Sequence, residues 1–232
     1  MTRSNEFGQT IGDPVPDWAP RPPTEPVELV GTRVRLEALR PDHAHVLHGP
    51  MVLESSPRIW TYYPDPDLTE PRAFEEYVEA LLTLPAAWPM AILTPDGSGR
   101  GVACFLRQDP ANGAVEVGGI VFAESLQRTA AATEAIYLML AHAFDDLGYR
   151  RFEWKCDSLN EPSRRAAARL GFTYEGRFRN AMVHPGRNRD TDWFSITDAE
   201  WPATQAAFEG WLAPDNFDEE GAQRRPLRSF RP

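Results

Sequence analysis

The stretch from Glu116 to Ala135 combines residue types that could bind a phosphate beside an acid–base group. An apolar segment that carries a carboxylate leads into a helix beginning with small residues. A helix start offers backbone N–H groups without intrahelical partners and the positive end of the helix dipole. The residues that could contact an anion there are Arg128, Thr129, Ala130, Ala131, Ala132 and Thr133. An alanine-rich helix start without any ligand explains the same residues equally well.

A second stretch, from Lys155 to Phe172, has the features of a capped helix. Asn160 is a favoured N-cap, Pro162 suits a first helical turn, and Gly171 supplies a left-handed stop. A capped helix alone accounts for these residues. It does not account for their pairing with the first stretch.

Strand and helix patterns alternate around these two stretches. Apolar–polar alternation and the turn dipeptides Asp96-Gly97 and Asn112-Gly113 mark the strands. Strands are predicted at residues 29–37, 88–94, 101–107, 114–122, 151–157, 172–178 and 192–197. Helices are predicted from residue 41, at 70–84, 129–147 and 160–170, and after Asp198, which we expect to cap the last one. This order indicates an α/β domain on a mixed sheet.

Composition limits the partners. There are 24 basic and 34 acidic residues, so the formal charge is 24 − 34 = −10, and an acidic surface does not favour nucleic acid. The sequence shows neither an apolar run that could span a membrane nor a secretory signal, so we expect a cytoplasmic protein. Cys104 and Cys156 lie in separate apolar segments and are expected to be buried and unpaired. Lys155 is the only lysine beside 23 arginines, which we interpret as coding bias.

The chain divides into three parts. Residues 1–27 contain six prolines and are expected to form an extended arm that Trp18 anchors to the body. Residues 28–213 form the domain. Residues 214–232 are a polar tail, expected to be mobile or ordered by a partner, with its arginines in solvent.

The two stretches together resemble the donor-binding core of the Gcn5-related N-acetyltransferase superfamily. Gln127 to Ala132 resembles its pyrophosphate loop, with alanines where glycines are more common, and Asn160 to Phe172 resembles the motif that follows. The branch with the best match contains ribosomal-protein alanine N-acetyltransferases, and the resemblance covers about residues 29–210. It implies a mostly antiparallel mixed sheet flanked by helices, with a splayed central strand pair.

The resemblance also implies a reaction: an amine attacks the thioester of acetyl-CoA directly, without a metal. The pyrophosphate would bind at residues 127–133, and Asn160 and Ser163 would contact the donor as well. The pantetheine arm would bond to the backbone of Gly119, Ile120, Val121 and Phe122. We expect Glu116 to be the base and Ser163 the proton donor to the thiolate, with Tyr174 as a second candidate. Structural roles for Glu116 and Ser163 remain open.

Aromatic and histidine side chains outside these two stretches are further candidates for a functional role. Trp60, Tyr62 and Tyr63 could line an acceptor pocket or pack in the core, and neither role is favoured. His43, His45 and His48 share a predicted helix, but packing explains them better than a metal site.

The acceptor is expected to be a small-molecule amine or a peptide N-terminus, and a homodimer is left open. Two alternatives remain. One is an acyltransferase that uses a longer or carrier-bound acyl group, and the other is a non-catalytic CoA-binding module.

Overall fold

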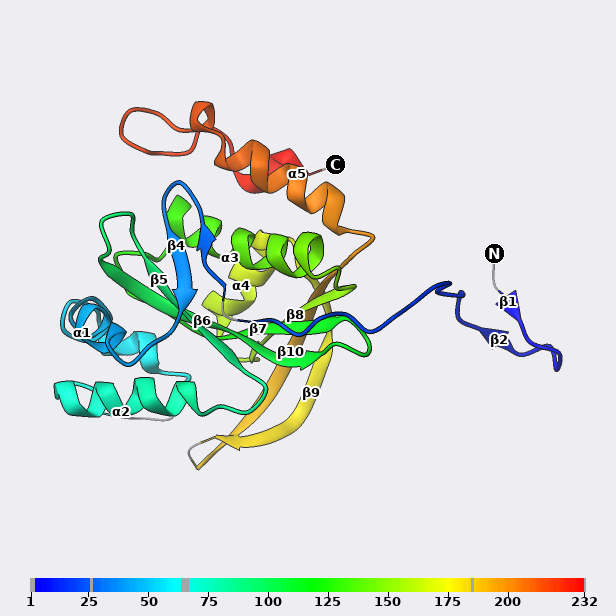
Figure 1. Ribbon diagram of the computed structural model, residues 1–232, viewed down its shortest axis with the longest axis horizontal. Coiled ribbons are helices and arrows are strands. Elements are labelled where there is room, and N and C mark those ends of the chain that lie inside the picture. The colour runs from blue at the N-terminus through cyan, green and yellow to red at the C-terminus, as the bar shows by residue number, and fades with distance from the viewer. Residues whose placement is uncertain (1–2, 26, 64–66, 185, 232) are drawn as a thin grey trace.

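The structure is a computed structural model that describes residues 3–25, 27–63, 67–184 and 186–231 (Figure 1). Its strands are β1 (Arg3–Ser4), β2 (Thr10–Ile11), β3 (Leu29–Val30), β4 (Arg35–Ala38), β5 (Trp88–Leu93), β6 (Gly99–Asp109), β7 (Ala114–Phe122), β8 (Arg151–Asp157), β9 (Thr173–His184) and β10 (Arg187–Thr197). Its α-helices are α1 (His43–His48), α2 (Pro71–Leu82), α3 (Ala130–Ala141), α4 (Glu161–Leu170) and α5 (Trp201–Leu212).

Most predicted elements are present within a few residues of their predicted ends. The strand predicted at 29–37 is instead the hairpin β3–β4, which turns at Gly31, and β9 and β10 extend as a long hairpin beyond the predicted ranges. Helix α3 continues as a wider π-helical turn, His142–Asp146.

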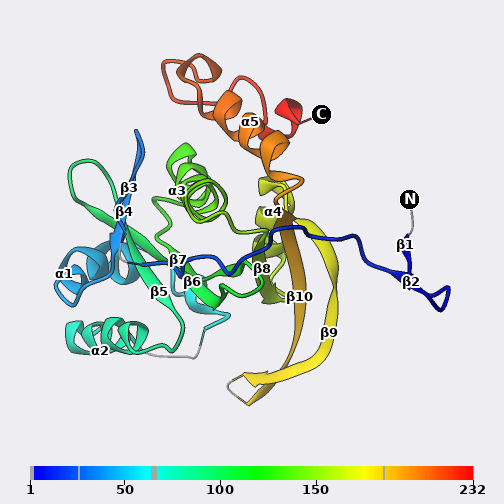
Figure 2. The same ribbon diagram turned by 45° about the vertical axis from the view of Figure 1, so that its right-hand side comes forward.

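Among the described residues, eight strands form one sheet in the order β3-β4-β5-β6-β7-β8-β10-β9. Only β7 and β8 pair in parallel; the other neighbours are antiparallel. Helices α3 and α4 cover one face, with α5 outside α3, while α1 and α2 cover the other (Figure 2). The expected mixed sheet flanked by helices is confirmed.

The parallel pair β7 and β8 separates partway along its length. Pairing runs from Ala114 opposite Arg151 to Val117 opposite Trp154, and no later residues of the two described strands pair. Gly119 has φ +58°, a conformation that favours glycine, and the register between β6 and β7 shifts at this point. The bulge turns β7 away from β8, so the splayed strand pair is present.

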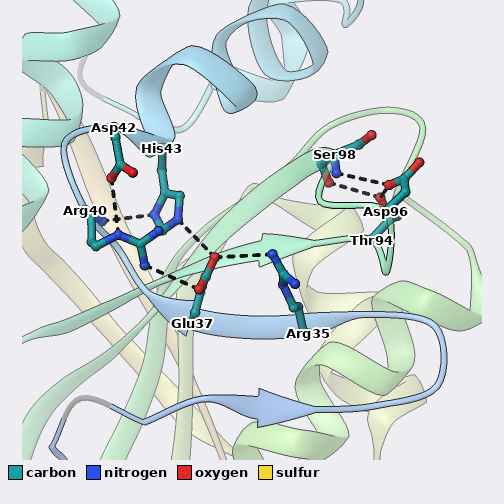
Figure 3. Close-up of polar contacts among 8 residues, drawn as sticks. All are labelled: Arg35, Glu37, Arg40, Asp42, His43, Thr94, Asp96 and Ser98. Atoms are coloured by element: carbon teal, nitrogen blue, oxygen red, sulfur yellow. Dashed lines mark hydrogen bonds and ion pairs between the residues drawn. The ribbon is translucent and has the colours of Figure 1, made fainter.

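The turn between β4 and α1 is closed by a buried histidine (Figure 3). The Arg40 backbone N–H donates to His43 Nδ1 at 3.0 Å, so Nε2 carries the proton and donates to Glu37 Oε1 at 3.1 Å. Burial, followed by the charge of Arg40, lowers the pKa of His43. His48 contacts the Leu68 carbonyl oxygen, so packing roles are confirmed for His43 and His48.

The N-terminal arm contacts the body through Trp18. Its indole N–H donates to the Ala111 carbonyl at 2.8 Å, and the guanidinium groups of Arg21 and Arg150 lie 4.7 and 5.3 Å from its ring centre. The predicted anchor is therefore confirmed. Beyond it, the hairpin β1–β2 extends away from the domain with exposed side chains (Figure 1).

The C-terminal tail is packed, which corrects the expectation of a solvated segment. Leu227 is buried, and the guanidinium group of Arg231 donates to the carbonyls of Ala168 and Arg169 at the end of α4. The Arg169 carbonyl accepts from no backbone N–H among the described residues, and the Ala168 carbonyl accepts from the Gly171 N–H at 3.3 Å, so a cation at this helix end is favourable. The sequence did not reveal this because the arginines contact backbone atoms distant in the chain.

The prediction that Asp198 caps the last helix is wrong. Helix α5 begins three residues later, at Trp201, and the Asp198 carboxylate accepts only from the next residue, Ala199, at 3.0 Å. Glu200 instead closes the turn before the helix, because its carboxylate accepts from the N–H and hydroxyl of Thr197, each at 2.8 Å.

Candidate active site

The start of α3 has the geometry of an anion site. Thr129 is the N-cap, and its hydroxyl accepts from the Ala132 N–H at 3.1 Å. Among the described residues, the N–H groups of Ala130 and Ala131 have no hydrogen-bond partner. Arg128, exposed and with φ +62°, precedes them. Two free N–H groups at the positive end of a helix, next to a cation, can bind a diphosphate.

Two residues expected at this site face elsewhere. The Gln127 amide donates to the Phe122 carbonyl at 2.9 Å and so fixes the connection between β7 and α3. The buried Thr133 hydroxyl accepts from Arg169 at 3.0 Å. Their roles in the structure are to hold the loop in shape.

The aromatic segment spans the opening between β7 and β8. The Tyr63 hydroxyl donates to the Ile120 carbonyl on β7, and the Tyr62 hydroxyl donates to the Leu159 carbonyl after β8, each at 2.8 Å. Trp60 packs edge-on against Tyr63. Burial raises the pKa of Tyr63, so its hydroxyl remains a proton donor at neutral pH. These residues cover the opening. Tyr63 donates to the Ile120 carbonyl, which is one of the backbone groups predicted to bond to pantetheine.

Ser163 lies at the first turn of α4, above β8. Its hydroxyl oxygen accepts from the Trp154 indole N–H at 3.0 Å, and its backbone N–H donates to the Asn160 side chain at 3.1 Å. Because the indole supplies a proton, the serine hydroxyl can donate its own to another atom. Burial raises the pKa of the neighbouring Cys156 thiol to about 11, so this cysteine is not a thiolate at neutral pH.

Glu116 lies on the opposite face of the sheet from Ser163 and is buried. Lys155 Nζ and Arg107 Nε lie 2.9 and 3.2 Å from its Oε2 atom. The other oxygen, Oε1, lies 3.0 Å from the point that a Cβ atom would occupy on Gly118, the first residue of β7 beyond its pairing with β8. Glu116 and Ser163 therefore flank the opening from its two sides.

Alternating acidic and basic side chains extend from Glu116 across the sheet to Glu175, and we call this row the charge ladder. Lys155 also lies 2.9 Å from Glu153, and Arg151 bridges Glu153 and Glu175. Burial alone would raise the pKa of Glu153, but hydrogen bonds from Arg151 and Lys155 outweigh it and lower that pKa. Sequence reasoning missed this ladder. The feature of the sequence that could have indicated this ladder is the single lysine, Lys155, which lies on β8 two residues after Glu153.

Tyr174 is separated from this cluster. It lies on the edge strand β9, half exposed, with its ring 5.3 Å from Phe194 and tilted against it. Phe194 pairs with Trp154, so Tyr174 is on the α4 face of the sheet, two strands away from β8. The structure thus brings Ser163 close to the opening and leaves Tyr174 at the edge.

Neither a metal-binding cluster nor a membrane-spanning helix is found among the described residues. The described residues contain no group of three His, Cys, Asp or Glu side chains that could hold a metal ion. None of the described helices is both long enough and apolar enough to cross a bilayer.

Comparisons with known proteins agree with this geometry. Residues 33–173 match the sequence model of the acetyltransferase (GNAT) domain. The chain therefore belongs to the GNAT acetyltransferase family.

Solved structures extend the likeness over most of the chain. A GCN5-related N-acetyltransferase from Brucella melitensis is 40% identical with a TM-score of 0.90, covering 93% of this chain and 99% of that one. A GNAT-family structure from Chromobacterium violaceum ATCC 12472 is 33% identical with a TM-score of 0.76, covering 83% and 97%.

One curated relative matches part of the chain. YdaF of Bacillus subtilis (strain 168), provisionally named a ribosomal N-acetyltransferase, is 28% identical over 106 residues. The match covers 46% of this chain and 57% of that protein, so it spans little more than half of the relative's length.

Proposed function

We propose that this protein is an N-acetyltransferase that moves an acetyl group from acetyl-CoA to a primary amine of a small molecule or a peptide N-terminus. The observation that carries the proposal is the opening between β7 and β8 with the free N–H groups of Ala130 and Ala131 at its end. A linear thioester donor that ends in a diphosphate fits such an arrangement.

The residues at the start of α3 and at the cap of α4 offer the chemical groups that could bind acetyl-CoA. Ala130 and Ala131 offer two N–H groups, and Arg128 adds a positive charge. Half-buried alanines leave the helix start open to a bulky anion, whereas larger side chains would cover it. Asn160 uses its carbonyl oxygen as a helix cap, which leaves its amide hydrogens for a donor carbonyl.

The chemistry requires one bond to form and one to break. The acceptor nitrogen bonds to the acetyl carbon, and the bond from that carbon to sulfur breaks. Glu116 Oε1 accepts the amine proton directly or through water, and the Ser163 hydroxyl donates a proton to the departing sulfur. The serine regains a proton from water and Glu116 releases one to water, so both return to their starting states. The two side chains come from opposite faces of the sheet, so one can reach the attacking nitrogen while the other reaches the departing sulfur.

The net charge of the chain and the name of one relative both favour a peptide N-terminus as the acceptor. The net charge of −10 attracts basic peptides by long-range electrostatics. YdaF, whose name refers to the ribosome, points to the same class. Basic peptides with a free N-terminus are therefore the first acceptors to test.

Donor binding and transfer can be measured separately. Saturating acetyl-CoA should raise the melting temperature, since a ligand at about 100 times its Kd contributes about 2.7 kcal/mol. Thiol release with a panel of amines and peptides, with the product checked by mass, tests transfer. If acetyl-CoA raises the melting temperature but no amine releases thiol, the protein is a binding module. If neither signal is seen, the donor assignment is wrong.

A further inference from the structure

Lys155 holds a position that no other basic residue of the chain shares. It is the single lysine among 24 lysines and arginines, and its side chain is only 5% exposed. It is also the first residue of β8 beyond the last pair with β7. A strongly hydrated ammonium group is costly to bury unless it is well paired.

The surroundings of Lys155 provide that pairing. Its Nζ atom lies 2.9 Å from Glu116 Oε2 and 2.9 Å from Glu153 Oε2, and 3.5 Å from the centre of the Trp193 ring. Charged and aromatic groups reach this cluster from five strands: Arg107 on β6, Glu116 on β7, Arg151 and Glu153 on β8, Trp193 on β10 and Glu175 on β9.

An arginine would not reproduce these contacts. The guanidinium group is planar and wider than an ammonium group, whereas Lys155 places a compact charge between two carboxylates and against an indole face. Every other basic residue in the chain is an arginine. The exception at this place indicates that the site requires the ammonium group.

We propose that Lys155 is a positioning residue for acetyl transfer, and this proposal rests on the proposed function. Among the contacts of Glu116 with Lys155 and Arg107, the shortest are to its Oε2 atom. Oε1 accepts no hydrogen bond among the described residues and lies 3.0 Å from the point that a Cβ atom on Gly118 would occupy, where the strands diverge. Lys155 thereby fixes the carboxylate with its proton-accepting oxygen toward the opening.

The proposal predicts a shift in the pH–rate profile. Lys155 is the cation with the shortest contact to the proposed base, so removing it should change how turnover depends on pH. In Lys155→Met, the acidic limb of kcat/KM against pH should move to higher pH. A misplaced carboxylate should also lower kcat about 10- to 100-fold, while the Kd of acetyl-CoA stays within about twofold.

A matched control separates positioning from general loss of structure. Arg33→Met also removes a cation from a buried glutamate, Glu134, at a place outside the opening. It should lower the melting temperature without moving the acidic limb. Lys155→Arg keeps the charge, so it should lower kcat and leave the limb in place. This variant also serves as the test if Lys155→Met does not fold, in which case a wild-type kcat in Lys155→Arg overturns the proposal.

A chemical measurement tests the same placement without turnover. Lys155 and the N-terminal amine are the only aliphatic amines in the chain, so an acylating reagent can add at most two groups there. Mass analysis should show rapid modification of the N-terminus and protection of Lys155. Equal rates overturn the proposal, because the ammonium group would then not be held between carboxylates.

Failure of the proposed role of Lys155 can be distinguished from failure of the proposed function. An active wild type whose acidic limb does not move in Lys155→Met overturns the role of Lys155 and leaves the proposed function standing. A wild type that neither binds acetyl-CoA nor acetylates any amine overturns both.

Discussion

At the scale of single residues, the proposed base and the proposed proton donor are held in place by different kinds of interaction. Glu116 is held by ions, through Lys155 and Arg107, whereas Ser163 is held by neutral hydrogen bonds from Trp154 and within α4. Ion pairs respond to pH and salt, and neutral hydrogen bonds respond to neither. The two residues should therefore respond differently to mutation.

Ser163→Ala should lower kcat without weakening donor binding. A thiolate that leaves without a proton donor meets a higher barrier, and general acid catalysis contributes about 100- to 10,000-fold. Steady-state rates and the Kd of acetyl-CoA, measured separately, test this. Ser229→Ala, an exposed serine in the tail, is the control and should match wild type. Wild-type turnover in Ser163→Ala would assign the proton to water.

His43 should make stability depend on pH at the acidic side. Its pKa is lowered in the folded protein, so its contribution is fully present above the unfolded value of about 6.5. That contribution is lost as pH falls from about 6.5 through the folded pKa, because the unfolded chain then takes up the proton. His43→Gln should flatten this part of the curve of unfolding free energy against pH. An unchanged slope would mean that His43 titrates equally in both states.

At the scale of elements, the sequence predicted the parts that local pattern determines. The ends of β7 and β8 were predicted to the residue, because alternation, Asn112-Gly113 and the Asn160 cap all act locally. The ladder from Glu116 to Glu175 was missed because it joins β6 to β9 across the sheet. Periodicity shows which residues share a face, but not which strands are neighbours.

The start of α3 gives a prediction for donor affinity. Ala130→Glu should place a carboxylate where the diphosphate binds and raise the Kd of acetyl-CoA at least about tenfold, or ~1.4 kcal/mol. The fold should survive because an acidic residue suits a helix N-terminus. Ala80→Glu, on the exposed side of α2, controls for added charge. Equal affinity in Ala130→Glu and wild type would place the diphosphate elsewhere.

Tyr63 tests whether pantetheine uses the β7 backbone. Its hydroxyl donates to the Ile120 carbonyl, so a donor amide bonds there either by displacing the hydroxyl or at the second lone pair of the carbonyl. Tyr63→Phe should lower the stability of the free protein by about 1–3 kcal/mol, the cost of a buried unpaired carbonyl. If the donor amide displaces the hydroxyl in wild type, acetyl-CoA should bind more tightly to Tyr63→Phe, and equal affinity would mean that the two donors share the carbonyl. Weaker binding would show that the tyrosine hydroxyl itself contacts the donor.

At the scale of the whole molecule, the two termini differ in how they join the domain. The hairpin β1–β2 has only exposed residues and lies beyond the Trp18 anchor, whereas the tail returns to the end of α4 (Figure 1). Both were predicted as extensions of residues 28–213. Composition could not separate them, because the tail is held by one buried leucine, by hydrogen bonds and by aromatic contacts with residues distant in the chain.

Truncation should therefore affect stability at one end only. Removing residues 227–232 exposes the surface that Leu227 covers, and burial of a leucine contributes about 1.5–3 kcal/mol. It also removes the Arg231 contacts with α4. At about 2–4 °C per kcal/mol for a chain of this size, the melting temperature should fall by several degrees. Removing residues 1–12 keeps Trp18 and should leave it unchanged. Equal effects of the two truncations would mean that the tail does not stabilise α4, and Leu227→Ala would then also be neutral.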